Sequence, residues 1–399
     1  MRFSLAVVTA LAHFVAASPM PEPTATPTAP PSLKARATTG AGDPITSLAG
    51  GSGVGGTTCT VTNQADASAA VSSCSNILLS GVTVEASSSL SLSVPTSGAL
   101  LFAGTMTVEY TPDTSYTPII ISGKHAKVAG LEGAVIDGQG SKYWDGKGSS
   151  GGIEKPDHFI KLTGLDESTF EEIKVQNWPS HGFDITHCDN LTMSNIIMDN
   201  SAGAGLTSDG VVLAHNTDGF DVNNCDGLYI SGAHVINEDD CVAVSSGSNM
   251  VFENLYCDGS HGLSIGSISS GVTVSNITFK DSTVVNGENG CRIKTDYGDD
   301  DSTVSDVTYS NIYVHNITAY AIDIQQDYKD GDPTGTPTDG ITVKNVVFED
   351  ITGAVGKSTA YEYYILCGST SSCEDITFTD VDVTGGETLC SPSSVCTGV

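Results

Sequence analysis

Acidic and histidine motifs recur at nearly constant intervals in the middle of this chain. They are Asn216-Thr217-Asp218, Asp239-Asp240 and Gly259-Ser260-His261-Gly262. Asp240 follows Asp218 by 22 residues, and His261 follows Asp240 by 21 residues. An interval of this length is typical of a solenoid, in which each turn of the chain stacks on the turn before it.

Stacking would bring these motifs together in space. Neighbouring strands lie about 4.8 Å apart, so equivalent positions on successive turns become side-chain neighbours. We therefore expect Asp218, Asp240 and His261 in one column, with Asp239 beside them. Three carboxylates in one small space cannot all ionise easily, so one of them keeps its proton to higher pH and can act as an acid. The pattern predicts acid–base chemistry, and we interpret the cluster as an active site.

The strands that would position this column are also visible in the sequence. From about Ile77 to Thr384, apolar and polar residues alternate in short β-branched runs, which is typical of strands with one buried face. Four runs align with one another: Phe220–Val222, Val242–Val244, Leu263–Ile265 and Arg292–Lys294. The alignment predicts an inward ladder of Val222, Val244, Ile265 and Ile293. Because side chains alternate along a strand, Arg292 and Lys294 share the outer face.

This pattern predicts an all-β fold, a right-handed parallel β-helix. About 300 residues at roughly 22 to 30 per turn give about ten turns, and crossovers between parallel strands are right-handed. A short helix over Ala65–Ser73, with Asn63 as its cap, is expected to close the N-terminal end. An antiparallel sandwich would also explain short strands, but it would not explain the aligned ladder.

The residues before this pattern are expected to lie outside the fold. Residues 1–18 have the basic start, apolar stretch and small-residue cleavage site of a signal peptide. Residues 19–36 are rich in Pro, Thr and Ala and indicate a propeptide, and residues 37–58 form a Gly/Ser/Thr-rich N-terminal arm. The catalytic β-helix then covers residues 59–399. We expect a secreted, extracellular protein, because no later segment is apolar enough to span a membrane.

The chain is strongly acidic, with a formal net charge of −31 at pH 7. Such a surface repels phosphates, which excludes nucleic acid as a partner. An anionic substrate could bind only at a locally basic patch. Arg292 and Lys294 are expected to form that patch beside the acidic cluster, because Arg can pair with a carboxylate through two bonds and Lys acts as a point charge.

Eleven cysteines in a secreted chain indicate disulfide bonds. Their spacing suggests the pairs Cys59–Cys74, Cys225–Cys241, Cys367–Cys373 and Cys390–Cys396. Cys188, Cys257 and Cys291 remain, and we expect them to be buried, with a further pair among them left open. Three Asn-X-Thr triplets predict glycosylation at Asn190, Asn276 and Asn316.

Together with Arg292-Ile293-Lys294-Thr295, the motifs above resemble the four signature segments of the fungal polygalacturonases in glycoside hydrolase family 28. Similarity extends to Trp144–Gly148 and Gln325–Tyr328, and it covers the chain from about Cys59 to the C-terminus. The resemblance implies a right-handed parallel β-helix that hydrolyses α-1,4-linked polygalacturonate with inversion at the anomeric carbon. It implies pectin as the partner of a monomeric enzyme that needs no metal or other cofactor.

The resemblance also implies the catalytic roles. Asp239 would protonate the leaving glycosidic oxygen, while Asp218 and Asp240 would hold and activate the attacking water. His261 would hydrogen-bond the acid or the substrate. Stacked turns place these carboxylates closer together than the roughly 6.5–9.5 Å usual for inverting enzymes, so the predicted inversion rests on the resemblance and not on spacing.

Four further residues are assigned to the substrate by the same resemblance. Arg292 and Lys294 would bind a galacturonate carboxylate. Asn216 would orient the site, and Tyr328 would line the sugar-binding face.

Other functions stay open at this point. They are an exo-acting or xylogalacturonan-directed polygalacturonase, a calcium-dependent pectate lyase on the same fold, and a non-catalytic β-helix that binds pectin. Compact loops favour endo attack, because exo enzymes of this kind carry insertions that block one end of the cleft. Asp299–Asp301 lacks a spaced ligand loop, and the other histidines, His181 among them, lack metal-ligand spacing, so no metal site is predicted.

Overall fold

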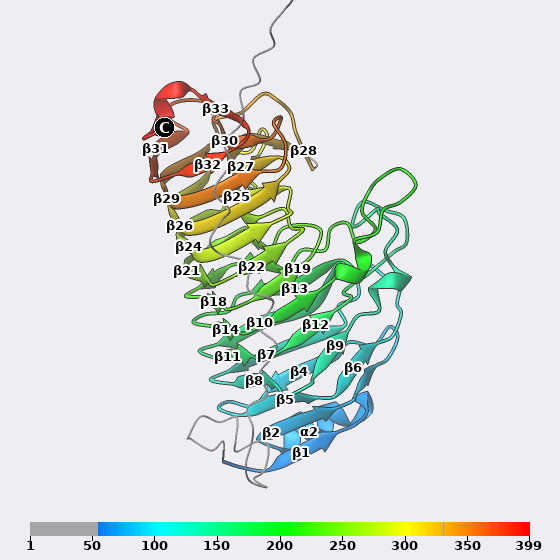
Figure 1. The fold of residues 1–399 in the computed structure, drawn as a ribbon. Coiled ribbons are helices and arrows are strands. Elements are labelled where there is room, and N and C mark those ends of the chain that lie inside the picture. Colours follow the sequence, from blue (N-terminus) through cyan, green and yellow to red (C-terminus); the bar gives the residue numbers. More distant parts are fainter. Residues whose placement is uncertain (1–54, 330) are drawn as a thin grey trace, which may run out of the picture. The chain divides into compact units, whose positions relative to one another are not determined.

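Two parallel β-sheets make up the fold (Figure 1). The computed structural model describes residues 55–329 and 331–399. The predicted signal peptide (1–18), the propeptide (19–36) and residues 37–54 of the arm lie outside the described residues. Among the described strands, antiparallel pairing is confined to one short strand and one isolated bridge. The fold is a right-handed parallel β-helix, as the sequence predicts.

The smaller sheet is a stack of eleven parallel strands in sequence order, with one short strand paired at its side. Its strands are β4 (Leu90–Val94), β7 (Ile119–Lys124), β10 (His158–Asp166), β13 (His181–Thr186), β16 (Phe220–Asn223), β20 (Val242–Val244), β23 (Leu263–Ile268), β25 (Asn289–Asp296), β27 (Tyr320–Lys329), β30 (Tyr361–Leu366) and β33 (Glu387–Ser391), with β28 (Asp332–Pro333) beside β27. Each strand of the stack belongs to one turn, in agreement with the predicted number of turns. This sheet carries the candidate site on its outer face.

The larger sheet has 22 strands, which pair in two ladders that merge where the strands become long. Its strands are β1 (Thr58–Val61), β2 (Asn76–Ser80), β3 (Thr83–Val84), β5 (Ala99–Ala103), β6 (Thr105–Val108), β8 (Lys127–Gly130), β9 (Val135–Asp137), β11 (Thr169–Glu171), β12 (Lys174–Gln176), β14 (Thr192–Ser194), β15 (Ile197–Asp199), β17 (Cys225–Asp226), β18 (Tyr229–Ser231), β19 (His234–Ile236), β21 (Gly247–Glu253), β22 (Tyr256–Asp258), β24 (Thr273–Val285), β26 (Ser302–Ile317), β29 (Ile341–Val355), β31 (Cys373–Thr379), β32 (Asp382–Thr384) and β34 (Cys396–Thr397). Long strands bend at left-handed residues such as Asp281 (φ 51°). Asn and Asp tolerate this conformation better than most residues, which explains why they punctuate the strands.

The predicted inward ladder is present. Val222 pairs with Val244, Val244 with Ile265, and Ile265 with Ile293, and all four side chains are fully buried. Aromatic rings stack elsewhere in the same core, for example Phe279 on Tyr309 with ring centroids 4.9 Å apart. Close packing of this kind fixes the strand register, and the register in turn decides which outward side chains become neighbours.

A short helix lies at the N-terminal end, as predicted. It is α2 (Ala67–Ser73), preceded by a 3-10 turn η1 (Gln64–Asp66). The Asn63 side chain accepts a hydrogen bond from the Asp66 N–H at 3.1 Å and so caps this turn. The helix packs against β4 and β1, the first strands of the two sheets. The remaining helical turns are η2 (Gly140–Lys142), η3 (Ser201–Gly203) and η4 (Ser393–Val395).

Three of the four predicted disulfides are present and one prediction is wrong. Cys59–Cys74, Cys367–Cys373 and Cys390–Cys396 are bonded as expected. Cys241, however, is bonded to Cys257 and not to Cys225, with 6.0 Å between the two Cα atoms. Cys225 begins β17 of the larger sheet, beyond the C-terminal end of β16, whereas Cys241 comes just before the start of β20. The two cysteines therefore lie at opposite ends of the paired strands β16 and β20. Cys225 instead lies beside Cys188, whose N–H donates to the Cys225 sulfur at 3.4 Å.

The predicted glycosylation asparagines Asn190, Asn276 and Asn316 are all exposed, and their modification stays a prediction. In residues 55–329 and 331–399, no helix is long and apolar enough to cross a membrane. Of the three cysteines that spacing left without a partner, Cys257 is bonded to Cys241, whereas Cys188 and Cys291 are buried and unbonded.

Candidate active site

The three aspartates lie on adjacent turns at the outer face of the smaller sheet. Phe220 of β16 pairs with Val242 of β20, so Asp218 and Asp240, each two residues earlier, become neighbours. Carboxylate oxygens of Asp218, Asp239 and Asp240 all lie within 4.8 Å of one another. We call this group the aspartate row. The sequence predicts this column, and the structure brings it together.

Main-chain contacts hold the two aspartate motifs in place. The buried Asn237 amide donates to the carbonyl oxygens of Thr217, Asp239 and Asp240 at 2.9–3.0 Å, and thereby ties two successive turns together. The Trp178 indole N–H donates to the Asp218 carbonyl oxygen at 3.1 Å. Both side chains were missed by the sequence reasoning, because neither residue type on its own indicates a supporting role.

Asp240 is the aspartate with the strongest positive partner. Its carboxylate accepts a hydrogen bond from Lys294 Nζ at 2.9 Å and another from Ser264 Oγ at 2.5 Å. Ser264 and Lys294 reach it from β23 and β25, the next two strands along the sheet. The charged donor and the hydroxyl donor together fix the orientation of the Asp240 carboxylate.

Asp239 is held in the ionised form by a different set of neighbours. Its Oδ2 accepts from Asn216 Nδ2 at 2.8 Å, and its Oδ1 lies 3.2 Å from His261 Nδ1. Burial by itself would raise the pKa of Asp239, but His261 and Lys294 lower it well below its usual range. For the imidazole of His261 burial has the opposite effect and lowers the pKa. The negative charges of Asp239 and Glu288 outweigh it and raise the pKa of His261 to about 9. The predicted contact between His261 and the assigned acid is therefore present.

Asp218 carries the opposite shift. Burial raises the pKa of Asp218 well above its usual range, and the charges of Asp239 and Asp221 add to the effect. These directions favour Asp218 as the member of the row that keeps its proton. The resemblance places the acid at Asp239 instead, so the two criteria point to different members of the aspartate row.

Asn216 is fixed by a glycine-rich loop from a distant part of the chain. Its side-chain oxygen accepts from the Ser149 N–H at 3.1 Å. A side chain at Gly148 would come within 2.1 Å of that oxygen, so only glycine fits there (φ 52°). The buried Lys155 ammonium donates to the Gly148 carbonyl at 2.8 Å and holds the loop down. This explains why the Trp144–Gly148 segment accompanies the site.

Arg292 and Lys294 lie together on the outer face, as predicted, and Tyr328 covers them. The Tyr328 ring centroid is 5.5 Å from Arg292 Cζ and 5.0 Å from Lys294 Nζ. Arg292 Nε is a buried donor without a hydrogen-bond partner among the described residues. Its nearest carboxylate oxygen, on Asp323, is 3.6 Å away. We call Arg292, Lys294, Asp323 and Tyr328 the cationic flank of the aspartate row.

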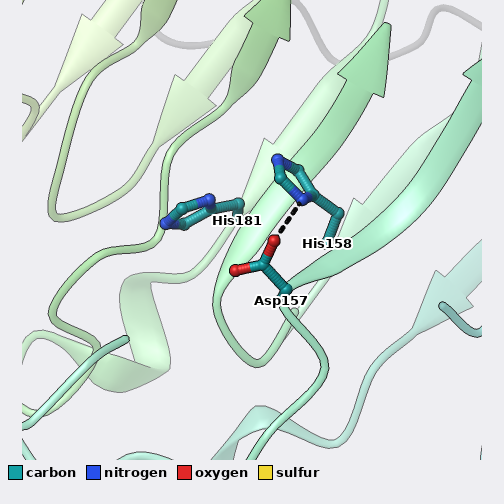
Figure 2. A group of neighbouring side chains, drawn as sticks. All are labelled: Asp157, His158 and His181. Carbon is teal, nitrogen blue, oxygen red and sulfur yellow. Dashed lines mark hydrogen bonds and ion pairs between the residues drawn. The ribbon is translucent and has the colours of Figure 1, made fainter. Parts of the chain in front are cut away.

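A second group, on the opposite side of the row, was missed. Asp157, His158 and His181 lie close together, and a hydrogen bond joins Asp157 to His158 (Figure 2). His158 on β10 pairs with His181 on β13, and the Gly182 N–H donates to the Asp218 carbonyl at 2.9 Å. The column therefore continues from Asp218 into the two histidines. His158 and His181 are 23 residues apart, about one turn, which is the signal that could have found them.

Asp221 joins this second group to the row. Its Oδ2 lies 3.1 Å from His158 Nε2 and 3.5 Å from His181 Nδ1. Burial lowers the pKa of His158, but hydrogen bonds to Asp157 and Asp221 raise it to about 10. We call Asp157, His158, His181 and Asp221 the histidine flank.

A family model described as "Glycosyl hydrolases family 28" matches residues 74–399 of this chain. The chain belongs to glycosyl hydrolase family 28. The resemblance drawn from the sequence motifs is therefore confirmed, and the protein is a glycoside hydrolase.

Relatives of this family 28 chain include fungal proteins of high identity. It is 49% identical over 380 residues to the "Probable endopolygalacturonase D" of Neosartorya fischeri, which covers 93% of this chain and 79% of that protein. It is 48% identical over 351 residues to the "Endopolygalacturonase D" of Aspergillus niger, covering 86% of this chain and 70% of that protein.

Solved structures show the same fold. The endopolygalacturonase I of Stereum purpureum, complexed with two galacturonate, superposes with a TM-score of 0.74 at 33% identity, over 83% of this chain and 95% of that one. The endo-xylogalacturonan hydrolase of Aspergillus tubingensis superposes with a TM-score of 0.69 at 26% identity, over 86% of this chain and 99% of that one.

Proposed function

We propose that this family 28 hydrolase is a secreted, monomeric endopolygalacturonase that cleaves α-1,4-galacturonosyl bonds inside polygalacturonate chains. The observation that carries the proposal is the aspartate row beside two buried cations on the outer face of one sheet. Its fungal relatives are named endopolygalacturonases, and a structural neighbour was solved with galacturonate bound. The predicted endo attack on pectin agrees with these relatives.

The cationic flank supports a uronate substrate over a neutral sugar. In a chain of net charge −31, two cations on one face make an exceptional local environment for an anion. Arg292 Nε has no hydrogen-bond partner among the described residues, and the Lys294 ammonium has donors beyond the one given to Asp240. A galacturonate carboxylate between them would satisfy these donors, with its ring against Tyr328.

Hydrolysis then follows from the roles assigned to the aspartates. Asp239 transfers its proton to the glycosidic oxygen as the bond from the anomeric carbon to that oxygen breaks. A water held by Asp218 and Asp240 attacks the anomeric carbon from the opposite face and gives up a proton to one of these carboxylates. His261 hydrogen-bonds Asp239 and sets its orientation. One water is consumed, and the configuration at the anomeric carbon inverts.

The cluster must rearrange one proton to react in this way. In the free protein the electrostatics favour a proton on Asp218 and an ionised Asp239. Oxygens of the two groups lie within 4.8 Å of each other, so a single transfer, direct or through one water, exchanges these states. Because strongly interacting carboxylates titrate as a unit, bound substrate selects the arrangement with the proton beside its glycosidic oxygen.

The short distances between the carboxylates of the aspartate row do not by themselves require retention of configuration at the anomeric carbon. Separations of about 5 Å are typical of enzymes in which one carboxylate attacks the sugar directly. Here two aspartates face the same space, and together they can hold a water that neither would hold alone. The first product distinguishes the two courses: nuclear magnetic resonance should detect the β-anomer of the new reducing end first, whereas initial α-anomer would establish retention.

The substrate and the mode of attack are tested together. Mature protein is incubated with polygalacturonate and a chelator, and viscosity, reducing ends and absorbance of unsaturated products are followed. A parallel sample contains added calcium. We expect a steep fall in viscosity at few new reducing ends, without unsaturation. Unsaturated ends that need calcium would establish a lyase, and monomeric galacturonate as the only early product would establish exo attack.

Replacing the assigned acid tests the chemistry. Asp239→Asn keeps the shape but removes the proton, and general acid catalysis contributes about 10²- to 10⁴-fold, so we expect kcat to fall by about that factor. Asp380→Asn is the matched control, because Asp380 is exposed and occupies a left-handed bend that Asn also adopts (φ 51°). Unchanged hydrolysis by Asp239→Asn would refute the assigned role, and absence of hydrolysis in the unmodified protein would support a non-catalytic pectin-binding protein.

A further inference from the structure

The histidine flank contains three convergent groups that the hydrolytic reaction does not use. Asp157, His158 and His181 each offer one nitrogen or oxygen atom, and these atoms all lie within 4.8 Å of one another (Figure 2). The side chains are 57%, 21% and 23% exposed in that order, so an ion from solvent can reach them. Two imidazoles and one carboxylate form a donor set that first-row transition ions bind.

The two histidines are positioned by regular structure and not by a loose loop. They occupy paired positions on the adjacent parallel strands β10 and β13, with ring centroids 4.9 Å apart. The His181 N–H donates to the Asp157 carbonyl oxygen at 3.1 Å, which ties the start of β13 to the residue just before β10. Donors fixed on neighbouring strands lose little freedom when they bind an ion.

Asp221 supplies the outer partner that metal-binding histidines usually have. Its Oδ2 lies 3.1 Å from His158 Nε2, and it can accept the proton of that nitrogen. His158 Nδ1 is then the nitrogen left to face Asp157 Oδ2, at 2.9 Å. An ion at this position would replace the proton that His158 and Asp157 share. The arrangement carboxylate–imidazole–ion fixes both the ring and its tautomer.

We propose that Asp157, His158 and His181 form a binding site for a divalent first-row transition ion such as Zn²⁺, with Asp221 as the supporting carboxylate and water completing the coordination. Calcium and magnesium prefer all-oxygen sites and are not expected here. The aspartate row offers only oxygen atoms and already holds Lys294 at 2.9 Å from Asp240, which opposes a second cation. The proposal does not depend on the proposed substrate.

Occupancy of this site would reach the aspartate row. His181 Nε2 is 3.7 Å from Asp218 Oδ1, so an ion on the histidines adds positive charge next to the carboxylate assigned to hold water. It also fixes His181 and Asp221, the two residues through which the histidine flank adjoins the row. The ion would therefore inhibit hydrolysis and would not serve as a cofactor.

Binding is measured directly and without substrate, because polygalacturonate itself binds divalent cations. The mature chain, carrying no polyhistidine tag, is titrated with ZnCl₂ near neutral pH by calorimetry, and Co²⁺ is used as a spectroscopic substitute. We expect one ion per chain, with visible Co²⁺ absorption typical of nitrogen ligands. His158→Gln and His181→Gln should each abolish this binding, and Asp221→Asn should weaken it about 10- to 100-fold. His315→Gln, which alters an exposed histidine on β26, should leave it unchanged.

Two results would overturn the proposal. One is a wild-type chain that takes up no Zn²⁺ under these conditions, a result that does not depend on any variant folding. The other is binding that persists in both histidine variants but disappears in Asp239→Asn, which would move the ion to the aspartate row. As a functional check, Zn²⁺ should slow hydrolysis by the wild type more than by His158→Gln at the same metal concentration, and a chelator should reverse the effect.

Discussion

The two flanks of the aspartate row use the same sheet and the same turn spacing, but they differ in which charge is in excess. On the cationic flank, Arg292 and Lys294 are only 6% exposed each, and Arg292 Nε lacks a hydrogen-bond partner among the described residues. On the histidine flank, both ring nitrogens of His158 and both of His181 lie within 4 Å of a carboxylate oxygen. The cationic flank leaves a guanidinium donor without a hydrogen bond, whereas every ring nitrogen of the histidine flank already has a carboxylate neighbour.

This difference indicates what each flank can receive. Surplus donors bind an anion, which under the proposed function is the carboxylate of a galacturonate unit. Carboxylates placed around imidazoles hold positive charge, whether a proton or a metal ion. The stacked turns therefore provide a common frame, and the residue types at equivalent positions decide between an anion site and a cation site.

Between the two flanks, the larger effect should come from removing the unpaired donor on the cationic flank. A hydrogen bond to a charged group is worth about 1.5–3 kcal/mol, so Arg292→Gln should lower kcat/KM on polygalacturonate about 10- to 150-fold. The loss should shrink on methyl-esterified oligogalacturonates, which lack the negative charge. Steady-state kinetics on the two substrates measure this difference.

A control separates this effect from a general loss of positive charge. Lys344→Gln removes a cation from β29 of the larger sheet and should change neither substrate preference nor rate. If Arg292→Gln lowered kcat/KM by the same factor on charged and on esterified substrates, Arg292 would support the fold of the site and would not bind the substrate carboxylate.

An intermediate effect is expected where a histidine and an aspartate form an ion pair inside the row. The pKa of His261 is about 9 in the folded chain, above its ordinary value of 6.5. Its stabilisation is therefore fully present below about pH 6.5 and is lost as the pH rises through 9. His261→Gln should lower the free energy of unfolding by about 2 kcal/mol at acidic pH, after allowance for a side chain that is 22% exposed, and by little above pH 9.

Urea unfolding of the wild type and of His261→Gln across this pH range tests the predicted direction of the pH dependence. A gap between wild type and His261→Gln that widens as the pH rises would contradict a charged His261 in the folded chain. The pH–rate profile adds a second check, because losing His261 should also raise the pKa of Asp239 and extend activity toward higher pH. His234→Gln, on β19 of the larger sheet, serves as the control, because it removes a histidine away from the aspartate row and should leave the pH–rate profile unchanged.

Much of this architecture could be predicted from the sequence because a solenoid repeats. The interval from Asp218 to Asp240 to His261 predicts a column, and the inward ladder from Val222 to Ile293 fixes the register of the same turns. Once the register is known, the alternation of side chains places Arg292 and Lys294 outside. These inferences needed only local pattern and the strand spacing.

Other features depended on distances that spacing does not determine. Cys241 is 16 residues from both Cys225 and Cys257, so spacing could not identify its disulfide partner. The position of each cysteine on its turn of the β-helix identifies Cys257 as that partner. The histidine flank was hidden because His181 and Asp218 are 37 residues apart. This separation is longer than one turn because a long loop connects β15 to β16. In addition, the ligand spacings known from helices and loops do not apply to stacked strands.

The smallest effect should come from His181→Gln in the metal-free enzyme. His181 is 23% exposed and lies 3.7 Å from Asp218 and 3.5 Å from Asp221, distances too long for strong hydrogen bonds. Partly exposed pairs of this kind contribute about 0–1 kcal/mol, so kcat/KM should fall no more than about fivefold when a chelator is present. The loss should therefore be at least about twofold smaller than that of Arg292→Gln. If His181→Gln instead cost as much as Arg292→Gln, and mostly on charged substrate, the histidine flank would be a second anion site, and the division of the row into an anion side and a cation side would be wrong.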